Sequence, residues 1–202
     1  MSGLSEVSRL LSQLDGAALQ LSHDVRWQPL TMLMIVASAW WVKWPLFALV
    51  GALGDASRRR RLPAAALCAG TAVALAAGLV SVFKDLFDRA RPPLGQPAID
   101  ALVSLPASSS FPSGHAATAF AGAVAVAMLH PRLRWPLLGL AAAVALSRVY
   151  LGVHYWSDIL AGSALGALTG FATTGAFLRV RPELPSLARA GKSLAIRARA
   201  PE

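Results

Sequence analysis

An arginine, a histidine and an aspartate lie in one short stretch between two apolar runs. The stretch is Ser-Arg-Val-Tyr-Leu-Gly-Val-His-Tyr-Trp-Ser-Asp, residues 147–158. Ionisable side chains at such a place are costly and are usually functional. If the following helix starts near His154, Asp158 lies one turn further along the same face, and its carboxylate can hold the imidazole. Such a pair beside Arg148 predicts an activated nucleophile or base that acts on an anion.

Two cations precede a proline earlier in the chain. Lys84 and Arg91 are seven residues apart, and Pro92 follows directly. Seven residues make nearly two helical turns, so the two side chains can face the same way if the helix persists, and the proline marks its end. Both are therefore candidates for holding an anion.

The third segment is Pro-Ser-Gly-His, residues 112–115, at the start of another apolar run. Ser113 can cap the helix that follows, and the free backbone N–H groups at that start make an anion site. Gly114 lets an oxygen approach the backbone closely. His115 adds a second imidazole.

Each piece also has an ordinary structural explanation. Lys84 can extend to the membrane surface from the end of a span, and Arg148 can anchor a helix at the interface. The 112–115 segment can be only a loop-to-helix start, with His115 packed there, and His154 and Asp158 can be a structural pair. The charged residues nearby are read as solvated loop or outer charges without a direct role: Asp85, Asp88, Arg89 and Asp100.

The composition is that of an integral membrane protein. Of 202 residues, 55% are hydrophobic and 14% are charged, whereas a soluble domain carries about 25% charged residues. The net charge of +9 would also suit a nucleic-acid binder, but the basic residues cluster in short segments between apolar runs, as they do where orientation in a membrane is set. We therefore expect membrane lipids around the chain and no nucleic-acid partner.

Six apolar runs are candidate spans: 27–42, 44–54, 62–83, 113–129, 135–151 and 155–178. One helix through the first two would be roughly 42 Å long, too long for a hydrocarbon core of about 30 Å, so two short tilted spans are predicted. Basic segments at 58–61, 130–134 and 179–202 are each separated by two spans and are expected in the cytoplasm. The segments 84–112 and 148–158 then share the outer side, and six spans place the N-terminus inside.

The expected fold is all-α, an integral membrane six-helix bundle with an amphipathic N-terminal helix. That helix occupies residues 1–28, the membrane-embedded domain residues 29–179, and a basic cytoplasmic tail residues 180–202. The N-terminal helix can lie on the membrane surface, or pack against the bundle or a dimer partner. A stripe of glycines favours close helix packing within the bundle first and a homodimer face second: Gly162, Gly166 and Gly170.

The three polar segments converge at one membrane face. Cations and N–H groups for oxygens, one histidine to attack phosphorus and one to protonate the leaving group are chemistry for a phosphate. At these residues the chain resembles the type-2 phosphatidic acid phosphatase superfamily, which includes bacterial membrane lipid phosphatases and vanadium haloperoxidases. Its signatures Lys-x6-Arg-Pro, Pro-Ser-Gly-His and Ser-Arg-x5-His-x3-Asp are complete here, within residues 84–158.

The resemblance implies a role for each of these residues. His154 would be the nucleophile that forms a phosphohistidine, Asp158 would orient it, and His115 would be the general acid and then activate water. Five residues would hold the phosphoryl oxygens: Lys84, Arg91, Ser113, Gly114 and Arg148. No carboxylate cluster suits Mg²⁺, so hydrolysis without a metal or cofactor is predicted.

The predicted function is hydrolysis of a lipid phosphate at the outer face of a bacterial inner membrane. A polyprenyl diphosphate is favoured because the outer loop is short and offers few headgroup contacts; phosphatidylglycerol phosphate, phosphatidic acid and a prenyl-linked sugar phosphate also fit. A vanadate-dependent haloperoxidase is the alternative within the superfamily, against which the short membrane-embedded chain argues. A lipid or phosphate transporter would place polar residues at mid-membrane, where this chain has few.

Overall fold

The computed structural model describes residues 2–57, 63–96 and 98–180, with the side chains of 2–5, 8 and 40–44 left aside. All regular structure in these residues is helical, as predicted. Nine helical segments follow in order: α1 Ser2–Asp24, α2 Gln28–Ser38, α3 Trp40–Ser57, α4 Ala64–Leu86, α5 Pro92–Gly95, α6 Gly114–Leu129, the 3₁₀ turn η1 Pro131–Leu133, α7 Arg134–Tyr150 and α8 Trp156–Val180.

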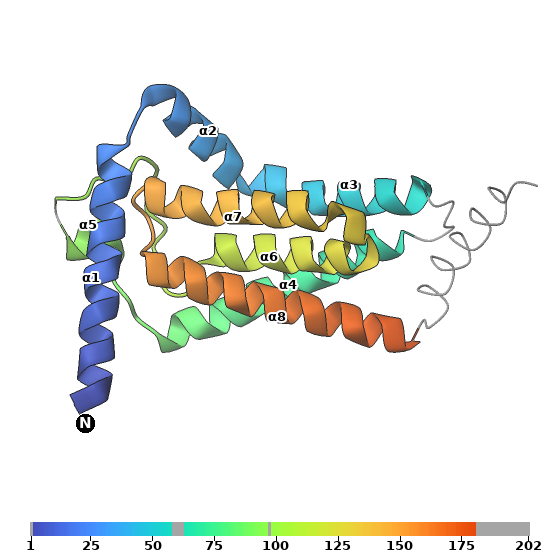
Figure 1. Ribbon diagram of the computed structural model, residues 1–202. Coiled ribbons are helices and arrows are strands. Elements are labelled where there is room, and N and C mark those ends of the chain that lie inside the picture. Colours follow the sequence, from blue (N-terminus) through green and yellow to red (C-terminus); the bar gives the residue numbers. More distant parts are fainter. Residues whose placement is uncertain (1, 58–62, 97, 181–202) are drawn as a thin grey trace, which may run out of the picture.

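The bundle consists of α3, α4, α6, α7 and α8, which run roughly parallel, with α1 lying across one end (Figure 1). Two of these helices, α4 and α8, are long and apolar enough to cross a membrane by themselves, and α2, Pro45–Ser57 and α6 are shorter apolar helices. The all-α membrane fold with an amphipathic N-terminal helix is therefore confirmed.

The path of the first two apolar helices differs from the prediction. α2 starts where the Trp27 N–H donates to the Tyr150 hydroxyl, at the end of α7, and α3 ends where Asp55 meets His130, just beyond α6. α2 packs on α7 and α3 on α4 and α6, and the chain is extended only at Ala39 between them. The two helices run one after the other in the same direction and cross the bundle together (Figure 1).

The N-terminal helix consequently lies at the opposite end of the bundle from the end of α8 (Figure 1). The prediction that both termini lie on the cytoplasmic side requires α2 and α3 to cross separately, whereas in the structure the two helices cross together. Among the described residues the crossings are α2 with α3, α4, α6, α7 and α8. The predicted basic segment 58–61 and the tail beyond residue 180 lie outside the described residues.

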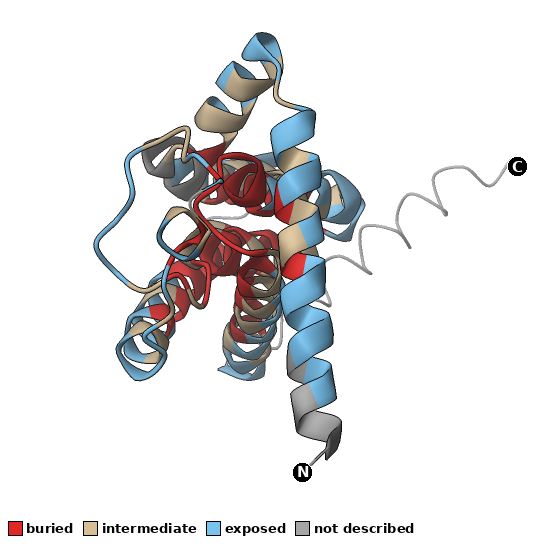
Figure 2. Ribbon diagram, turned by 90° about the vertical axis from the view of Figure 1, so that its left-hand side faces the viewer, coloured by how far each residue is buried: buried red, intermediate tan, exposed pale blue. Residues whose placement is uncertain are grey.

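Helix α6 is the centre of the bundle and packs against α3, α4, α7 and α8. Its alanines let neighbouring helices come close, and most are completely buried. The glycine stripe of α8 faces it: a Cβ on Gly170 would lie 3.2 Å from the Cα of Ala121, and one on Gly162 would lie 3.2 Å from the carbonyl carbon of Ser113. The stripe is thus a packing surface within the bundle. Figure 2 shows the buried residues gathered along the bundle axis, whereas α1 is mostly exposed.

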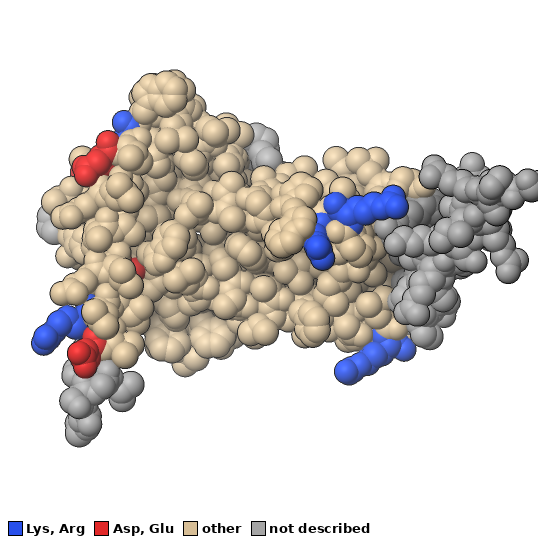
Figure 3. Space-filling model, in the orientation of Figure 1, with Lys and Arg blue, Asp and Glu red and all other residues tan. Residues whose placement is uncertain are grey.

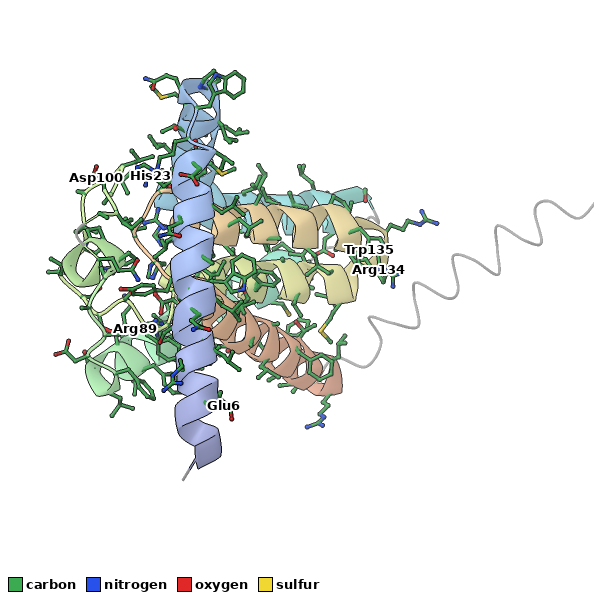
Figure 4. The ribbon with its side chains drawn as sticks, turned by 60° about the vertical axis from the view of Figure 1, so that its left-hand side comes forward. Glu6, His23, Arg89, Asp100, Arg134 and Trp135 are labelled. Carbon is green, nitrogen blue, oxygen red and sulfur yellow. The ribbon has the colours of Figure 1, made fainter. Side chains whose placement is uncertain are left out.

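On the face seen in Figure 3, the described charged side chains lie towards the two ends of the bundle, and the described residues between them are uncharged. Figure 4 shows Arg134 and Trp135 at one end, and Arg89 and Asp100 at the other, beside α1. Trp135 is 69% exposed. Apolar helices such as α4, α6 and α8, with charged side chains towards their ends, are the arrangement expected of a chain that spans a bilayer.

Candidate active site

The sharp end of α7 places Arg148 and His154 on either side of one turn. The Val153 N–H donates to the carbonyl of Arg148 and the Gly152 N–H to that of Val149, which is the paired hydrogen-bond pattern that closes a helix through a left-handed residue. Gly152 has φ +71°, and an added Cβ would lie 2.6 Å from the Asp100 carbonyl. Glycine is therefore required here, and His154 follows immediately outside the helix.

Asp158 is held at the start of α8 rather than in its middle. It is the third residue of the helix, and its carboxylate accepts the Tyr155 N–H at 2.9 Å, which satisfies a backbone donor just before the helix. The same oxygen, Oδ2, lies 3.4 Å from the His154 Nδ1. The predicted pair is thus present, but it forms across the loop–helix junction, because α8 begins at Trp156.

Ser110 also contacts this pair, although nothing in its sequence context singles it out. Its hydroxyl donates to the Asp158 Oδ2 at 2.5 Å and lies 3.4 Å from the His154 Nδ1. With Nδ1 facing the carboxylate, the other ring nitrogen, Nε2, faces Arg91 at 3.4 Å from its Nη1. The imidazole edge that is left for a substrate therefore points towards cations.

Arg91 and Lys84 reach this place by different routes. α4 ends at Leu86, so the predicted helix does not persist to Arg91, which arrives through an irregular segment. Arg91 donates to the carbonyls of Val153, Pro106 and Ser109, and the Lys84 Nζ donates to the Ser109 carbonyl at 2.6 Å. The two cations meet on the 106–109 loop.

Arg148 has a buried donor without a partner. The side chain is 5% exposed, and its Nε makes no hydrogen bond. Burying an unpaired donor of a charged group costs free energy, and here the neighbouring charge of Arg91 adds to the cost. A phosphoryl oxygen bound between the two guanidinium groups would remove that cost.

His154 is a neutral imidazole at neutral pH. It is 3% exposed, and burial lowers its pKa; the hydrogen bond to Asp158 opposes this, but Arg91 and Arg148 reinforce it, and the pKa falls to about 4. Burial and the cations therefore outweigh the carboxylate. An unprotonated ring nitrogen beside two cations is what a nucleophile towards an anionic group needs.

The 112–115 segment forms the start of α6 against the start of α8. The Ser113 hydroxyl accepts the Ala116 N–H, which confirms it as the N-cap, while its own N–H donates to the Asp158 carbonyl at 3.0 Å. The Ser113 N–H is therefore not available to an oxyanion, contrary to the prediction. Gly114 and His115 occupy the first two positions of the helix and are partly exposed.

Arg89 contacts the Asp158 carboxylate from the other side, so it is not the outer charge without a direct role that its sequence position predicts. Its Nη1 donates to the Asp158 Oδ1 at 2.5 Å and its Nη2 to the Asp15 Oδ2 at 2.7 Å. Burial works against its charge, but the hydrogen bonds and charges of Asp15 and Asp158 outweigh burial and raise its pKa. Asp85, Asp88 and Asp100 are exposed, as expected for loop charges.

No group of three His, Cys, Asp or Glu side chains within residues 2–57, 63–96 and 98–180 has the arrangement of a metal-ligand set. Hydrolysis without a metal stays a prediction.

Comparison with known proteins agrees with this geometry. A mycobacterial protein, decaprenylphosphoryl-5-phosphoribose phosphatase of Mycobacterium tuberculosis, is 39% identical over 129 residues, which cover 64% of this chain and 68% of the relative. The transmembrane PAP2 type phosphatidylglycerolphosphate phosphatase of Bacillus subtilis superposes with a TM-score of 0.70 at 26% identity, covering 85% of this chain and 88% of that one.

A second solved structure, Aquifex aeolicus LpxE, shares the fold with a TM-score of 0.66 at 23% identity, over 79% of this chain and 94% of that one. The family model of the PAP2 superfamily matches residues 65–182, a range that contains every residue of the three polar segments. The chain therefore belongs to the PAP2 superfamily and is a membrane lipid phosphate phosphatase.

Proposed function

We propose that the protein removes a phosphate from a polyprenyl carrier lipid through a phosphohistidine on His154. The observation that carries the mechanism is a neutral, buried imidazole whose Nε2 faces Arg91, next to a buried Arg148 donor that has no partner. A phosphoryl group between these three side chains finds both a nucleophile and the hydrogen-bond donors that stabilise its charge in the transition state.

In the first step the His154 Nε2 attacks phosphorus and the bond to the leaving oxygen breaks. His115 donates its proton to that oxygen, so the leaving group departs neutral at this atom. Asp158 accepts the hydrogen bond from the Nδ1 side and stabilises the positive charge of the ring. Arg91, Arg148 and Lys84 hold the phosphoryl oxygens, with the Ser113 hydroxyl and the start of α6.

In the second step water attacks the phosphohistidine and the phosphorus–nitrogen bond breaks. His115, now unprotonated, takes the proton from water, which returns His115 to its starting state and leaves His154 neutral again. Phosphate is released. Each proton that His115 gives in the first step is thus recovered in the second.

Two relatives support a polyprenyl substrate and differ in the phosphate that they act on. The mycobacterial relative is a phosphatase for a decaprenylphosphoryl phosphoribose, a sugar phosphate monoester. The second relative, an undecaprenyl-diphosphatase of Sulfolobus acidocaldarius, is 43% identical over 68 residues, which cover 33% of this chain and 32% of the relative. We favour the monoester because the mycobacterial phosphatase is similar to this protein over more of the chain. The diphosphate is the second candidate.

The general acid separates these two candidates. A sugar alcohol is a poor leaving group that needs a proton, whereas a polyprenyl phosphate leaves readily as an anion. Purified wild type and His115→Ala are compared by phosphate release from prenylphosphoryl phosphoribose, polyprenyl diphosphate, phosphatidylglycerol phosphate and phosphatidic acid. We expect the highest kcat/KM of the wild type on prenylphosphoryl phosphoribose. We also expect His115→Ala to lower kcat/KM more on this substrate than on polyprenyl diphosphate.

The mechanism is tested by His154→Ala and by trapping. Rapid acid-free quenching of wild type with ³²P-labelled substrate should give an alkali-stable, acid-labile phosphoprotein that His154→Ala lacks. Full phosphatase activity in His154→Ala would refute the nucleophile. Preference for a glycerolipid phosphate would refute the polyprenyl substrate and leave the nucleophile intact.

We also propose that the site end of the bundle faces the periplasm or cell exterior of a bacterial cytoplasmic membrane. Arg132 and Arg134 follow α6 at the other end, and basic residues favour the cytoplasmic side. A cysteine placed at the exposed Gln13 of α1 should react with a membrane-impermeant thiol reagent on intact cells, and one placed at Arg132 should react only after lysis. The opposite pattern would reverse the orientation.

A further inference from the structure

We propose that Asp15 of α1 and Arg89 are positioning residues for Asp158, so that the N-terminal helix is part of the active centre. The inference rests on the role of Asp158 in the proposed function. Asp15 lies outside the segment 65–182 that the family model matches, and it sits in a helix that the sequence left without a role.

Arg89 joins two carboxylates with its two terminal nitrogens. Nη1 donates to Asp158 and Nη2 to Asp15, and the guanidinium carbon lies 4.1 Å from the centre of the Tyr155 ring. A planar guanidinium that stacks on a ring and bonds at both ends is fixed in orientation. Arg89 therefore fixes the Asp158 oxygen that does not face His154.

Asp15 holds the same helix start directly. Its Oδ1 accepts the Ser157 N–H at 2.8 Å and its Oδ2 accepts the Ser157 hydroxyl at 2.7 Å. Ser157 is the second residue of α8, where a backbone N–H has no partner within its own helix. The Asp15 carboxylate of α1 thus caps the start of α8 at Ser157, the residue directly before Asp158. A negative charge at this end of the helix also suits the helix dipole.

Both carboxylates of this network are buried and therefore need partners. Asp15 is 3% exposed and Asp158 is completely buried, so each carboxylate depends on partners for the loss of water. Arg89 supplies the positive charge that the two share. If either Arg89 or Asp15 is neutralised, the other groups must re-pair, and the oxygens of Asp158 move relative to the His154 ring.

The docking face of α1 is also centred on Asp15. Leu19 is completely buried and Ser22 donates to the Val149 carbonyl, whereas Leu14 and Leu21 are 59% and 65% exposed. α1 therefore attaches to the bundle through the face that carries the Asp15 carboxylate, and the two exposed leucines point away from that contact.

The experiment compares Asp15→Asn, Arg89→Gln, Arg89→Lys and the double variant Asp15→Asn/Arg89→Gln in the full chain. Asp24→Asn and Arg9→Gln, exposed positions on α1, are the matched controls, and Asp158→Asn is the reference. kcat and KM are measured by phosphate release on variants that elute as a single species in detergent. Residues within one hydrogen-bond network couple by amounts that correspond to about tenfold in rate.

We expect kcat to fall about tenfold in Asp15→Asn and at least as far in Arg89→Gln, with KM within about twofold of wild type, and the double variant to be no worse than Arg89→Gln. Arg89→Lys should lie between, because an ammonium keeps the charge but cannot bond both carboxylates in one plane. A purely structural role would lower the yield of folded protein and leave kcat per folded molecule unchanged.

Four outcomes decide the question. Unchanged kcat in Asp15→Asn and Arg89→Gln, with Asp158→Asn inactive, would overturn this inference and leave the proposed function standing. Full activity in Asp158→Asn would overturn the proposed function itself. Losses that multiply in the double variant would show two independent effects and overturn the bridge. If Asp15→Asn does not fold, Arg89→Lys with kcat equal to wild type is the overturning result.

Discussion

Adding one methyl group at Gly166 should disturb the active centre from a distance. A Cβ built there lies 2.8 Å from the carbonyl carbon and 2.9 Å from the Cα of Ala117, and closer still to the carbonyl oxygen, whereas ordinary contact begins at 3.4 Å. These neighbours are the backbone of α6, which cannot rotate away. α8 must therefore separate from α6 by at least about 0.6 Å, the difference between the 3.4 Å contact and the 2.8 Å carbonyl-carbon distance.

The cost follows from this displacement. Overpacking of a tight interface costs about 1–3 kcal/mol, and about 2 kcal/mol in a chain of this size lowers Tm by about 4–8 °C. Asp158 lies eight residues before Gly166, about 12 Å along the same helix. Since a 1 Å misplacement can cost about 10²-fold in rate, we expect Gly166→Ala to lower kcat about tenfold.

The matched control lies on the same helix. Gly175 has no heavy atom within 4 Å of a built Cβ, so Gly175→Ala should keep wild-type activity and gain up to about 1 kcal/mol from alanine's higher helix propensity. Thermal unfolding in detergent and phosphate release in the same detergent measure both effects. A Tm and kcat equal to wild type in Gly166→Ala would refute the close packing of α8 on α6. Equal losses of Tm and kcat in Gly166→Ala and Gly175→Ala would refute it as well.

Further predictions concern the chemistry of the site. In the proposed mechanism His154 must be unprotonated to attack phosphorus. Because its pKa is about 4, kcat/KM should stay level as pH falls from 7 to 5 and should drop below about pH 4. A loss of kcat/KM that begins near pH 6.5 would contradict a buried neutral ring. Arg148→Lys should weaken inhibition by inorganic vanadate about tenfold through loss of the planar donor fork, and an equal effect of Arg179→Lys, at an exposed position, would make it non-specific. Ser110→Ala removes the hydroxyl that donates to Asp158 and should lower kcat about tenfold at constant KM; an altered KM alone would point to substrate contact instead. EDTA should leave activity unchanged, and loss that Mg²⁺ restores would disprove hydrolysis without a metal.

Much of the site could be predicted from the sequence because its residues lie next to helix starts and helix ends, which neighbouring residues mark. Ser113 precedes an apolar run and caps it, and Gly152 between Arg148 and His154 ends α7. The contact that the four-residue spacing of His154 and Asp158 predicts is formed, even though α8 starts between the two residues. Such features depend on a few neighbouring residues, so a sequence window contains everything that decides them.

Other features had no local signal strong enough to be read. Asp15 is 142 residues from Ser157, and Ser110 is 48 residues from Asp158. Asp15 interrupts the apolar side of α1, four residues after Leu11, and a carboxylate at such a position is the one hint of a buried polar partner. Hydrophobic periodicity tells which face of a helix is apolar, but it does not tell which helix that face meets.

The sequence by itself determined that the protein is an α-helical membrane protein with three polar signature segments, because composition, helix caps and residue spacing are local quantities. Only the tertiary structure decided that α2 and α3 cross together, that α1 lies at the site end, and that Arg89 bridges Asp15 and Asp158. It also decided that His154 is neutral, since a pKa depends on how much water and how many charges the folded chain leaves around the ring.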